Sequence, residues 1–430
     1  MKKYFVIISL SILSLVTTCA NADIFRDATA GQSKKITAEY FGLHFHRLVL
    51  RPNEKAIVTQ WPQLQVGSVR LWDSTVRWAD IVPTAGQWNF ERLDKYVDLA
   101  EEHHASILYT LGSTPQWASA RPDEKCPYGL GCAAEPVRMA HWEEYVRQVA
   151  QRYRGRIKTY ELWNEPHFSD FVRDRNKLGF YTGSVANMVE MAGIARKVLD
   201  EVDPEAKLTT PGFVSGSEHL DMFLAAGGKQ YIQGVTFHFY ANSAENFAKK
   251  VLEIRSGMEK NGVGVLPLWN TEAGLEVWDE EKLPPGTVRL TRNDAAAMTA
   301  QFLVLGAAVG LDRYYYYAWD NDRSGMVDRS GKHLPAYKAF AQVEKWLIGA
   351  TMTGCESFNS KVVACNGSKD KRNFKIVWSD KPQTQAISVP QGLRFAGQET
   401  LMGESVPKFK VATGQVFATV SQAPTLLWFN

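Results

Sequence analysis

Apolar positions along the chain alternate between two spacings. Short runs rich in aromatic and β-branched residues, such as residues 105–112 and 235–240, have the length of buried strands. Longer segments between them carry apolar residues every three or four positions, as in the stripe from Leu93 to Ala100, which is typical of an amphipathic helix. This alternation predicts a parallel sheet whose strands are joined by crossover helices.

Eight strand-like runs are separated in this way. They cover residues 40–46, 66–73, 105–112, 160–168, 207–213, 235–240, 266–274 and 313–320. Eight such units over roughly 300 residues fit a (β/α)8 TIM barrel of the α/β class. A doubly wound open sheet is the alternative, but the first run is not followed by a Gly-rich phosphate loop.

The pattern changes after residue 350. Short alternating runs such as FKIVW and QVFATV are separated by Gly, Asn, Ser and Pro, which predicts a small C-terminal β-sandwich over residues 350–430 with a packing role. We expect the catalytic barrel in residues 23–349. The polar segment 23–37 is a candidate for an additional strand of the sandwich.

The N-terminus has the features of a secretory signal. Lys2 and Lys3 precede an apolar stretch, and Ala20-Asn21-Ala22 forms a small-x-small cleavage site, so residues 1–22 predict a signal peptide cleaved after Ala22. A lipoprotein anchored at Cys19 is the alternative, although Thr18 is a poor match for the small residue expected before that cysteine. We find no other segment of transmembrane length, so we expect a secreted or periplasmic protein.

Export changes the interpretation of the cysteines. The four that remain form two pairs close in sequence, and an oxidising compartment favours the disulfides Cys126–Cys132 and Cys355–Cys365. Zinc is the alternative for CPYGLGC, but no set of His or Cys partners lies nearby. With 49 basic and 46 acidic residues and no basic run, nucleic acid is not an expected partner, and we expect a monomer.

Two glutamates stand at strand ends. In a (β/α)8 barrel the functional groups lie at the C-terminal ends of the strands, where Glu165 follows in YELWNEPHF and Glu272 in LPLWNTEAG. Their separation of 107 residues corresponds to three barrel units, so both side chains are expected at equal depth. Carboxyl groups about 5–5.5 Å apart are what a retaining glycosidase requires.

The neighbours of the glutamates suit different protonation states. Arg70 and Tyr240 favour the ionised form of Glu272 by charge and hydrogen bonding, whereas apolar surroundings favour a protonated Glu165. Asn164 is placed to donate a hydrogen bond to a sugar 2-hydroxyl. No metal and no organic cofactor is required.

Further candidates for substrate contact share the same end of the barrel. Alternation directs His238 and His44 toward the mouth or the barrel interior, and for such a histidine a core role and a substrate role both remain open. Trp319 and Trp117 follow strands and are candidate platforms for sugar rings.

These motifs carry a family resemblance. LWNEPH and NTEAG resemble the strand-four and strand-seven motifs of clan A glycoside hydrolases. FGLHFH, SVRLWD, LYTLGSTPQWAS and YYYYAWD, with the trailing sandwich, resemble glycoside hydrolase family 39 and, within it, bacterial endoglycosidases linked to biofilm exopolysaccharide.

The resemblance assigns roles to particular residues. It implies that Glu165 is the general acid/base and Glu272 the nucleophile. It also implies that Asn164 contacts the 2-hydroxyl and that Arg70 and Tyr240 orient the nucleophile. Trp319 would be the platform under the sugar, followed by a cis peptide bond to Asp320.

One departure bears on the mode of action. Ala273-Gly274 follows Glu272 where the xylosidases and iduronidases of the family carry a bulky residue, which is closer to endo-acting clan members. The sequence therefore predicts a retaining glycoside hydrolase, endo-acting on a β-linked exopolysaccharide by double displacement. The alternatives are an exo-β-glycosidase of the xylosidase type and a non-catalytic polysaccharide-binding protein of the cell envelope.

Overall fold

The computed structural model describes residues 23–50, 58–171, 179–278, 290–358, 362–403, 410–412 and 414–430. The predicted signal peptide lies outside these residues. Within them, no helix combines the length and the apolar character needed to cross a membrane.

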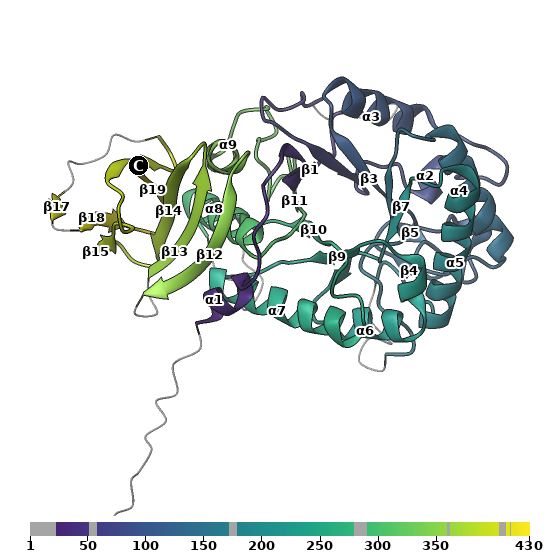
Figure 1. Cartoon of the computed structure of the whole chain (residues 1–430). Helices are drawn as coiled ribbons and strands as arrows, with labels where there is room; N and C mark the ends of the chain where they lie inside the picture. Colours follow the sequence, from purple (N-terminus) through teal and green to yellow (C-terminus); the bar gives the residue numbers. More distant parts are fainter. Residues whose placement is uncertain are drawn as a thin grey trace, which may run out of the picture.

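A parallel sheet forms the larger part of the molecule (Figure 1). Its strand order is β7-β6-β3-β2-β1-β11-β10-β9-β8. The strands are β1 (Phe41–His44), β2 (Ser68–Leu71), β3 (Ser106–Thr110), β6 (Thr159–Glu161), β7 (Lys207–Thr209), β8 (Phe213–Val214), β9 (Val235–His238), β10 (Leu268–Ala273) and β11 (Arg313–Tyr316). Each overlaps one of the eight predicted runs, and only Thr159 of β6 and Val214 of β8 lie one residue outside them.

The two end strands of this order belong to a single run. β7 and β8 lie on either side of Pro211, whose ring provides no backbone N–H for a ladder. The isolated parallel bridges Asn164–Gly212 and Thr209–Gly234 connect the run to both neighbours. The sheet therefore closes on itself, and the predicted (β/α)8 barrel is confirmed.

Helices surround the barrel (Figure 1). The stripe predicted from Leu93 to Ala100 is buried in α3, as the amphipathic pattern requires. The helices of this layer are α2 (Trp78–Ile81), α3 (Glu91–Glu102), α4 (Met139–Arg152), α5 (Val185–Val202), α6 (Glu218–Ala225), α7 (Ala244–Lys260), α8 (Arg292–Ala308) and α9 (Pro335–Leu347).

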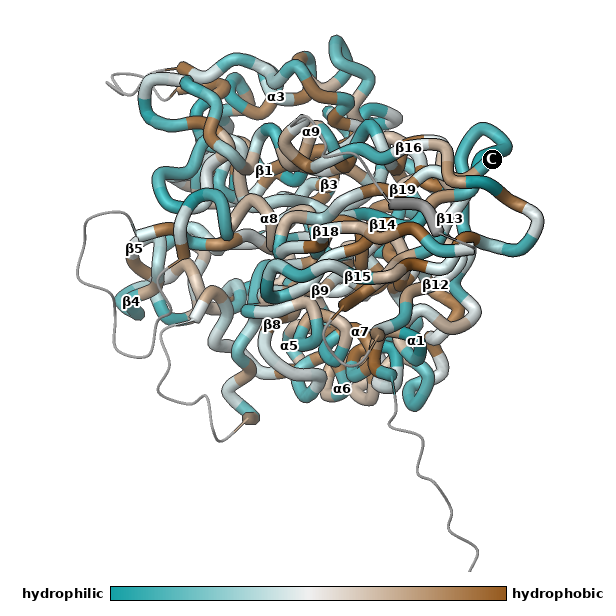
Figure 2. The backbone as a smooth tube through the Cα atoms, turned by 90° about the vertical axis from the view of Figure 1, so that its left-hand side faces the viewer, coloured by the Kyte–Doolittle hydropathy of each residue, from teal (hydrophilic) through white to brown (hydrophobic). Residues whose placement is uncertain are grey.

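The C-terminal residues form two antiparallel sheets. One has the order β12-β13-β14-β19-β16 and the other β15-β18-β17. Their strands are β12 (Thr351–Phe358), β13 (Val362–Lys369), β14 (Arg372–Ser379), β15 (Gln383–Ser388), β16 (Phe395–Thr400), β17 (Lys410–Ala412), β18 (Gln415–Val420) and β19 (Thr425–Phe429). Val416, Ala418 and Val420 alternate inward along β18 and share a core with Val377 and Leu427 of the other sheet. Figure 2 shows apolar residues recurring along these strands, and the predicted β-rich C-terminal unit is confirmed.

A half-buried carboxylate connects the second unit to the barrel. Glu399 of β16 accepts hydrogen bonds from Lys345 and Trp346 of α9 and from Trp428 of β19. These contacts fit the packing role expected for the sandwich.

The segment 23–37 differs from a simple added strand. Asp23 caps a short helix, α1 (Ile24–Thr29), by accepting a hydrogen bond from the Phe25 N–H. Phe25 and Ala28, three residues apart, bury the inner face of this turn. Pairing with the sandwich consists of the isolated bridge Lys35–Thr351.

Both predicted disulfides are present. Cys126 and Cys132 join the ends of the hairpin of β4 (Lys125–Cys126) and β5 (Gly129–Leu130). Cys355 and Cys365 face each other across β12 and β13.

Candidate active site

The two predicted catalytic glutamates meet at the C-terminal ends of the barrel strands. Glu272 is the fifth residue of β10, and Glu165 lies four residues after the end of β6. One carboxylate oxygen of each, together with a ring nitrogen of His238, lie within 4.8 Å of one another. Residues 107 positions apart in sequence are thus brought into one site, at a distance suited to attack on one sugar.

The backbone of Glu165 has an unusual conformation. Its φ angle is +41°, in the left-handed region that non-glycine residues rarely adopt, and Pro166 further restricts it. The Glu165 N–H donates to the Gly212 carbonyl at 2.9 Å, which holds this turn against the neighbouring strand. Strained backbone of this kind concentrates at functional sites, where the surrounding structure over-determines it.

Arg70 of β2 is the centre of a buried polar network. It has no exposed surface, and each of its three side-chain nitrogens donates: Nε to Glu161 at 2.8 Å, Nη1 to Glu272 at 2.9 Å and Nη2 to the Asn164 amide oxygen at 2.6 Å. Because Arg70 takes the amide oxygen, the amide NH2 of Asn164 remains the group for a ligand. Arg70 therefore acts on the site through its partners.

Glu272 accepts hydrogen bonds at both oxygens. The Tyr240 hydroxyl donates to Oε1 at 2.7 Å, opposite the Arg70 contact at Oε2. Burial raises the pKa of the Glu272 carboxyl, while the charges of His238 and Arg70 oppose the rise and those of Glu165 and Asp73 add to it. The donors favour the ionised form as predicted, but burial outweighs them in the net direction of the pKa.

His238 is placed behind the acid rather than in open space. It is fully buried, and its Nδ1 lies 2.7 Å from Glu165 Oε1 and 3.9 Å from Glu272 Oε2. Its Nε2 faces the Cα of Gly212, where a Cβ would lie 2.6 Å from that nitrogen. The sequence-based alternative of a supporting role for His238 fits this geometry better than direct contact with a sugar.

Three other candidates occupy supporting positions. His44 is buried, and its Nε2 contacts the Thr271 carbonyl oxygen at 2.9 Å, one residue before the nucleophile candidate. Trp319 is only 3% exposed and packs against His333 and Tyr337, so the predicted platform role does not fit it. Trp117 is half-buried and donates its indole N–H to the Val82 carbonyl at 2.8 Å.

Tyr317 takes the position expected for Trp319. It is half-buried, its N–H donates to the Ala273 carbonyl at 2.9 Å, and its hydroxyl donates to Asp73 at 2.8 Å. The cis peptide expected after Trp319 lies at Tyr317–Ala318 instead. The run of four tyrosines, residues 314–317, masked this position, because alternation alone does not tell which tyrosine leaves the strand.

A glycine is required next to the nucleophile candidate. A Cβ on Gly274 would lie 2.0 Å from the Tyr317 carbonyl oxygen. The Ala273-Gly274 sequence, which departs from the xylosidase pattern, thus allows β10 and the chain after β11 to approach closely.

The geometry also bears on metal binding. Glu165, His238 and Glu272 form a group with the spacing of a metal site. However, Arg70 and Tyr240 already donate to Glu272, and the Arg70 cation lies within hydrogen-bond distance of the same carboxylate. A metal ion would be repelled by that cation and would have to displace these bonds, so the residues do not fit a metal.

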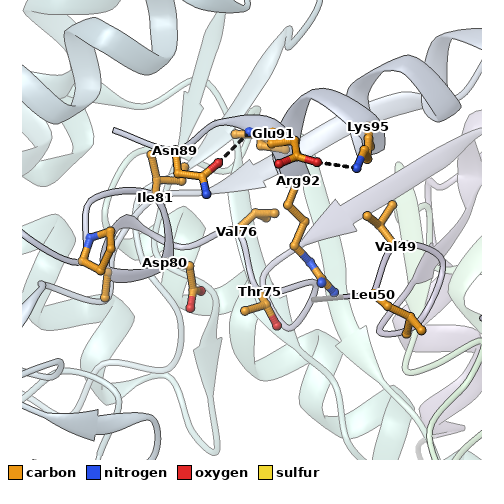
Figure 3. Close-up of a pocket in the computed structure, with 13 residues that line it drawn as sticks. Val49, Leu50, Thr75, Val76, Asp80, Ile81, Asn89, Glu91, Arg92 and Lys95 are labelled. Atoms are coloured by element: carbon orange, nitrogen blue, oxygen red, sulfur yellow. Dashed lines mark hydrogen bonds and ion pairs between the residues drawn. The ribbon is translucent and has the colours of Figure 1, made fainter. Parts of the chain in front are cut away.

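A separate cavity lies beside the barrel. It has a volume of about 470 Å³ and is lined by residues of the loops after β1 and β2 and of α3, including Arg92, Asp80 and Lys95 (Figure 3). Lys95 pairs with Glu91, and Asp80 pairs with Arg77. Arg92 donates to the carbonyl oxygens of Ser74 and His46. Neither Glu165 nor Glu272 is among the lining residues.

Comparisons with known proteins point to sugar hydrolysis. A family model described as glycosyl hydrolase family 10 matches residues 38–216. A β-xylosidase of Geobacillus stearothermophilus is 24% identical over 176 residues, which cover 39% of this chain and 33% of that protein. The matched part thus spans about a third of the length of this curated relative.

Solved structures share the fold over most of the chain. A family 39 glycoside hydrolase from Bacteroides cellulosilyticus WH2 superposes with a TM-score of 0.68 at 17% identity, covering 92% of this chain and 82% of that one. A family 39 enzyme from Xanthomonas axonopodis pv. citri gives 0.61 at 15% identity, with 94% and 96% covered. A family 30 subfamily 8 xylanase from Clostridium acetobutylicum gives 0.59 at 14%, with 85% and 89% covered. The paired glutamates and these matches together support a glycosidase built on the clan A barrel, with a resemblance to glycoside hydrolase family 39.

Proposed function

We propose that this protein is a retaining glycoside hydrolase that cleaves internal linkages of a β-linked exopolysaccharide. The observation that carries the proposal is the approach of Glu165 and Glu272 to within 4.8 Å, with different hydrogen-bond partners for each. This close approach favours a retaining pair, with carboxyl groups about 5–5.5 Å apart, over an inverting pair, whose groups stand about 6.5–9.5 Å apart to admit a water.

The hydrogen-bond partners of the two glutamates support a different role for each. Glu272 accepts from a cation and from a tyrosine hydroxyl, so it is the carboxylate that stays ionised and attacks the anomeric carbon. Glu165 carries the proton and gives it to the leaving glycosidic oxygen as the C–O bond breaks. A glycosyl ester on Glu272 results. Glu165, now ionised, then takes a proton from water, which attacks the ester and releases Glu272.

The substrate-binding groups surround this pair. The amide NH2 of Asn164 donates to the sugar 2-hydroxyl, and Tyr317 replaces Trp319 as the proposed platform. A cavity of about 450 Å³ shares Tyr240 with the site, and its other lining residues are Ala241, Asn242, Asn246, Lys249, Lys250 and Glu253. Its polar lining supports binding of sugar units beyond the one that reacts, and this favours endo action.

The proposed cellular location and the proposed substrate class each rest on separate observations. The N-terminal signal pattern and two disulfides support a secreted or periplasmic location. The xylosidase and xylanase among the similar proteins make β-xylosides the first substrates to test, with β-glucosides as the comparison. The C-terminal unit, residues 350–430, is proposed to support the barrel of residues 23–349 without contacting substrate.

The decisive experiment separates the two glutamates. With a dinitrophenyl β-glycoside, whose leaving group needs no acid, Glu165→Gln should release one equivalent rapidly and then stall, and added azide should restore turnover. Glu272→Gln should release nothing with or without azide. Full turnover in either variant would refute the assignment, and binding of oligosaccharide without hydrolysis by the parent chain would favour the alternative of a binding protein.

The mode of attack is tested by product analysis. An endo-acting enzyme should shorten the polymer quickly while few reducing ends appear, and the first product should keep the β-configuration of its new anomeric centre. Release of single sugars from chain ends would instead support the xylosidase-like alternative.

A further inference from the structure

The disulfide loop of residues 126–132, here called the arm, reaches from the β3–α4 connection to the proposed active site. Cys126 and Cys132 close it, and the hairpin of β4 and β5 forms its two sides. Gly129 and Gly131 have φ angles of +141° and +73°, so the tip takes a path that other residues would resist. The disulfide and the glycines together give this short loop a defined shape.

Tyr128 is the residue of the arm that lies at the proposed active site. Its hydroxyl donates to Asp73 Oδ1 at 2.6 Å and accepts from the Trp72 indole N–H at 2.8 Å. The Arg77 guanidinium lies over its ring, 3.6 Å from the centroid. Tyr128 is thus held at its hydroxyl and on its face, while remaining half-buried.

Asp73 joins the arm to the loop after β11. Its second oxygen, Oδ2, accepts from the Tyr317 hydroxyl at 2.8 Å. Tyr317 is bonded through its N–H to Ala273, the residue after the proposed nucleophile. A continuous chain of hydrogen bonds therefore runs from the arm through Asp73 and Tyr317 to β10.

Asp73, Tyr128 and Tyr317 form a cluster that lies close enough to Glu272 for its charge to affect the titration of the two tyrosines. Burial is the main cause that raises the pKa of Tyr128 and of Tyr317, and the charges of Asp73 and Glu272 add to both shifts. Asp73, Tyr128 and Tyr317 are all half-buried, whereas Arg70 and His238 behind the glutamates are fully buried. The three residues of the cluster therefore belong to the half-buried part of the site, which is here called the accessible layer.

The negative charge of the accessible layer limits the kinds of sugar that it can bind. Asp73, Glu165 and Glu272 supply carboxylates. Each nitrogen of the nearby Arg70 already donates to a protein acceptor, and the Arg77 guanidinium on Tyr128 is paired with Asp80. An anionic sugar such as a uronate would be repelled. A neutral sugar would find a carboxylate with remaining lone pairs for its hydroxyl groups and aromatic faces for its C–H groups.

We infer that the arm and Asp73 form a subsite for a neutral, β-linked sugar next to Glu272, with Tyr128 as a specificity-determining residue held in place by the Cys126–Cys132 bond. The inference rests on the proposed function in that the ligand is a sugar. It assigns to this disulfide a role in substrate binding, in contrast to the disulfide of the C-terminal sheets.

The second disulfide provides a matched control. Cys126–Cys132 and Cys355–Cys365 close loops of similar length, with sequence separations of 6 and 10, so their removal should relax the unfolded chain to a similar degree. We would compare Cys126→Ser/Cys132→Ser with Cys355→Ser/Cys365→Ser, and both with Tyr128→Phe, which leaves the disulfide and the ring in place.

Binding is measured without hydrolysis, in the Glu165→Gln background, by calorimetry with xylotetraose and cellotetraose. The arm variant should weaken the Kd of the better-bound tetrasaccharide tenfold or more, and Tyr128→Phe should weaken it severalfold. For the control variant Cys355→Ser/Cys365→Ser, the Kd should stay within twofold of the value for the parent chain. In chains with Glu165 intact, the arm variant should raise KM for the tetrasaccharide more than it lowers kcat for an aryl glycoside.

The outcomes separate the two proposals. Arm-dependent binding by a chain that hydrolyses no glycoside would retain the subsite and refute the proposed function. Equal Kd values for the arm variant and the parent would overturn the subsite even if hydrolysis is established. Equal weakening in both disulfide variants, or no binding of either tetrasaccharide by the parent, would also overturn it.

Discussion

Replacing Tyr240 with phenylalanine removes a single oxygen from the proposed active site. The hydroxyl donates to Glu272 Oε1 at 2.7 Å, while Arg70 holds Oε2 independently at 2.9 Å. The ring of Tyr240 remains, so packing around the loop after β9 should be preserved. The variant thus isolates one hydrogen bond to the proposed nucleophile.

The size of the effect follows from the kind of bond that is lost. A hydrogen bond to a charged group contributes about 1.5–3 kcal/mol. Tyr240 holds Glu272 in its attacking orientation, so most of this energy should be lost from the transition state. We therefore expect kcat/KM to fall by roughly 10- to 150-fold.

The pH dependence gives an independent check. Burial already raises the pKa of Glu272, and losing a donor that favours the ionised form should raise this pKa further. Because Glu272 must be ionised to attack, the acidic limb of the kcat/KM profile should move to higher pH. A variant that merely loosened the fold would lower activity without moving this limb.

The assay is the pH profile of kcat/KM with an aryl β-glycoside, together with the melting temperature. Trp319→Phe serves as a control, because Trp319 is buried and its ring packs against His333 and Tyr337. A loss of less than threefold with an unmoved acidic limb in Tyr240→Phe would refute the reasoning that Tyr240 supports the nucleophile.

Four further predictions follow from buried contacts. Glu161→Gln breaks the buried pair with Arg70 and should lower the free energy of unfolding by about 3 kcal/mol in urea denaturation; a loss below about 1 kcal/mol would contradict it. Gly274→Ala places a methyl group against the Tyr317 carbonyl and should reduce both kcat/KM and stability, the latter by about 1–3 kcal/mol; unchanged kinetics would argue against close packing there. Burial raises the pKa of Glu344 from 4.5 to about 7, so this group lowers stability by about 3 kcal/mol as pH rises through that interval. Glu344→Gln should therefore raise the melting temperature at neutral pH but not in acid, and equal shifts at both would refute this. Dialysis against a chelator should leave kcat/KM unchanged, because Arg70 occupies the position from which a cation would neutralise Glu272.

Much of the barrel could be predicted from sequence because its strands are short, apolar and evenly separated by helical stripes. Glu165 and Glu272 could be placed in one site for the same reason, since equal unit lengths bring equivalent strand ends to the same depth. Arg70 and Tyr240 were predicted as partners of Glu272, and the structure shows both contacts.

Other parts of the site depend on information that alternation does not carry. Which of the residues 314–319 leaves the strand toward the glutamates depends on how the chain turns after β11, and this decides between Tyr317 and Trp319. For His238 the sequence does not decide between a core role and a substrate role, because a strand pattern gives the direction of a side chain but not its partner. Tyr128 approaches the site through a loop with no periodic pattern, so only the structure connects CPYGLGC with Asp73.

The polar groups of the site form a buried layer and an accessible layer, and the two layers have different tasks. Arg70, Glu161 and His238 are fully enclosed, and a cation there is tolerated because it is paired with carboxylates on two sides. This layer fixes Asn164, Glu165 and Glu272 from behind without meeting a ligand. Asp73, Tyr128, Tyr240 and Tyr317 remain half-buried in front of it and vary in origin, coming from four different strand connections. Changes in the buried layer, and loss of the Tyr240 hydroxyl that holds Glu272, should therefore lower activity on every substrate. Changes at Asp73, Tyr128 or Tyr317 should instead alter which sugar is bound.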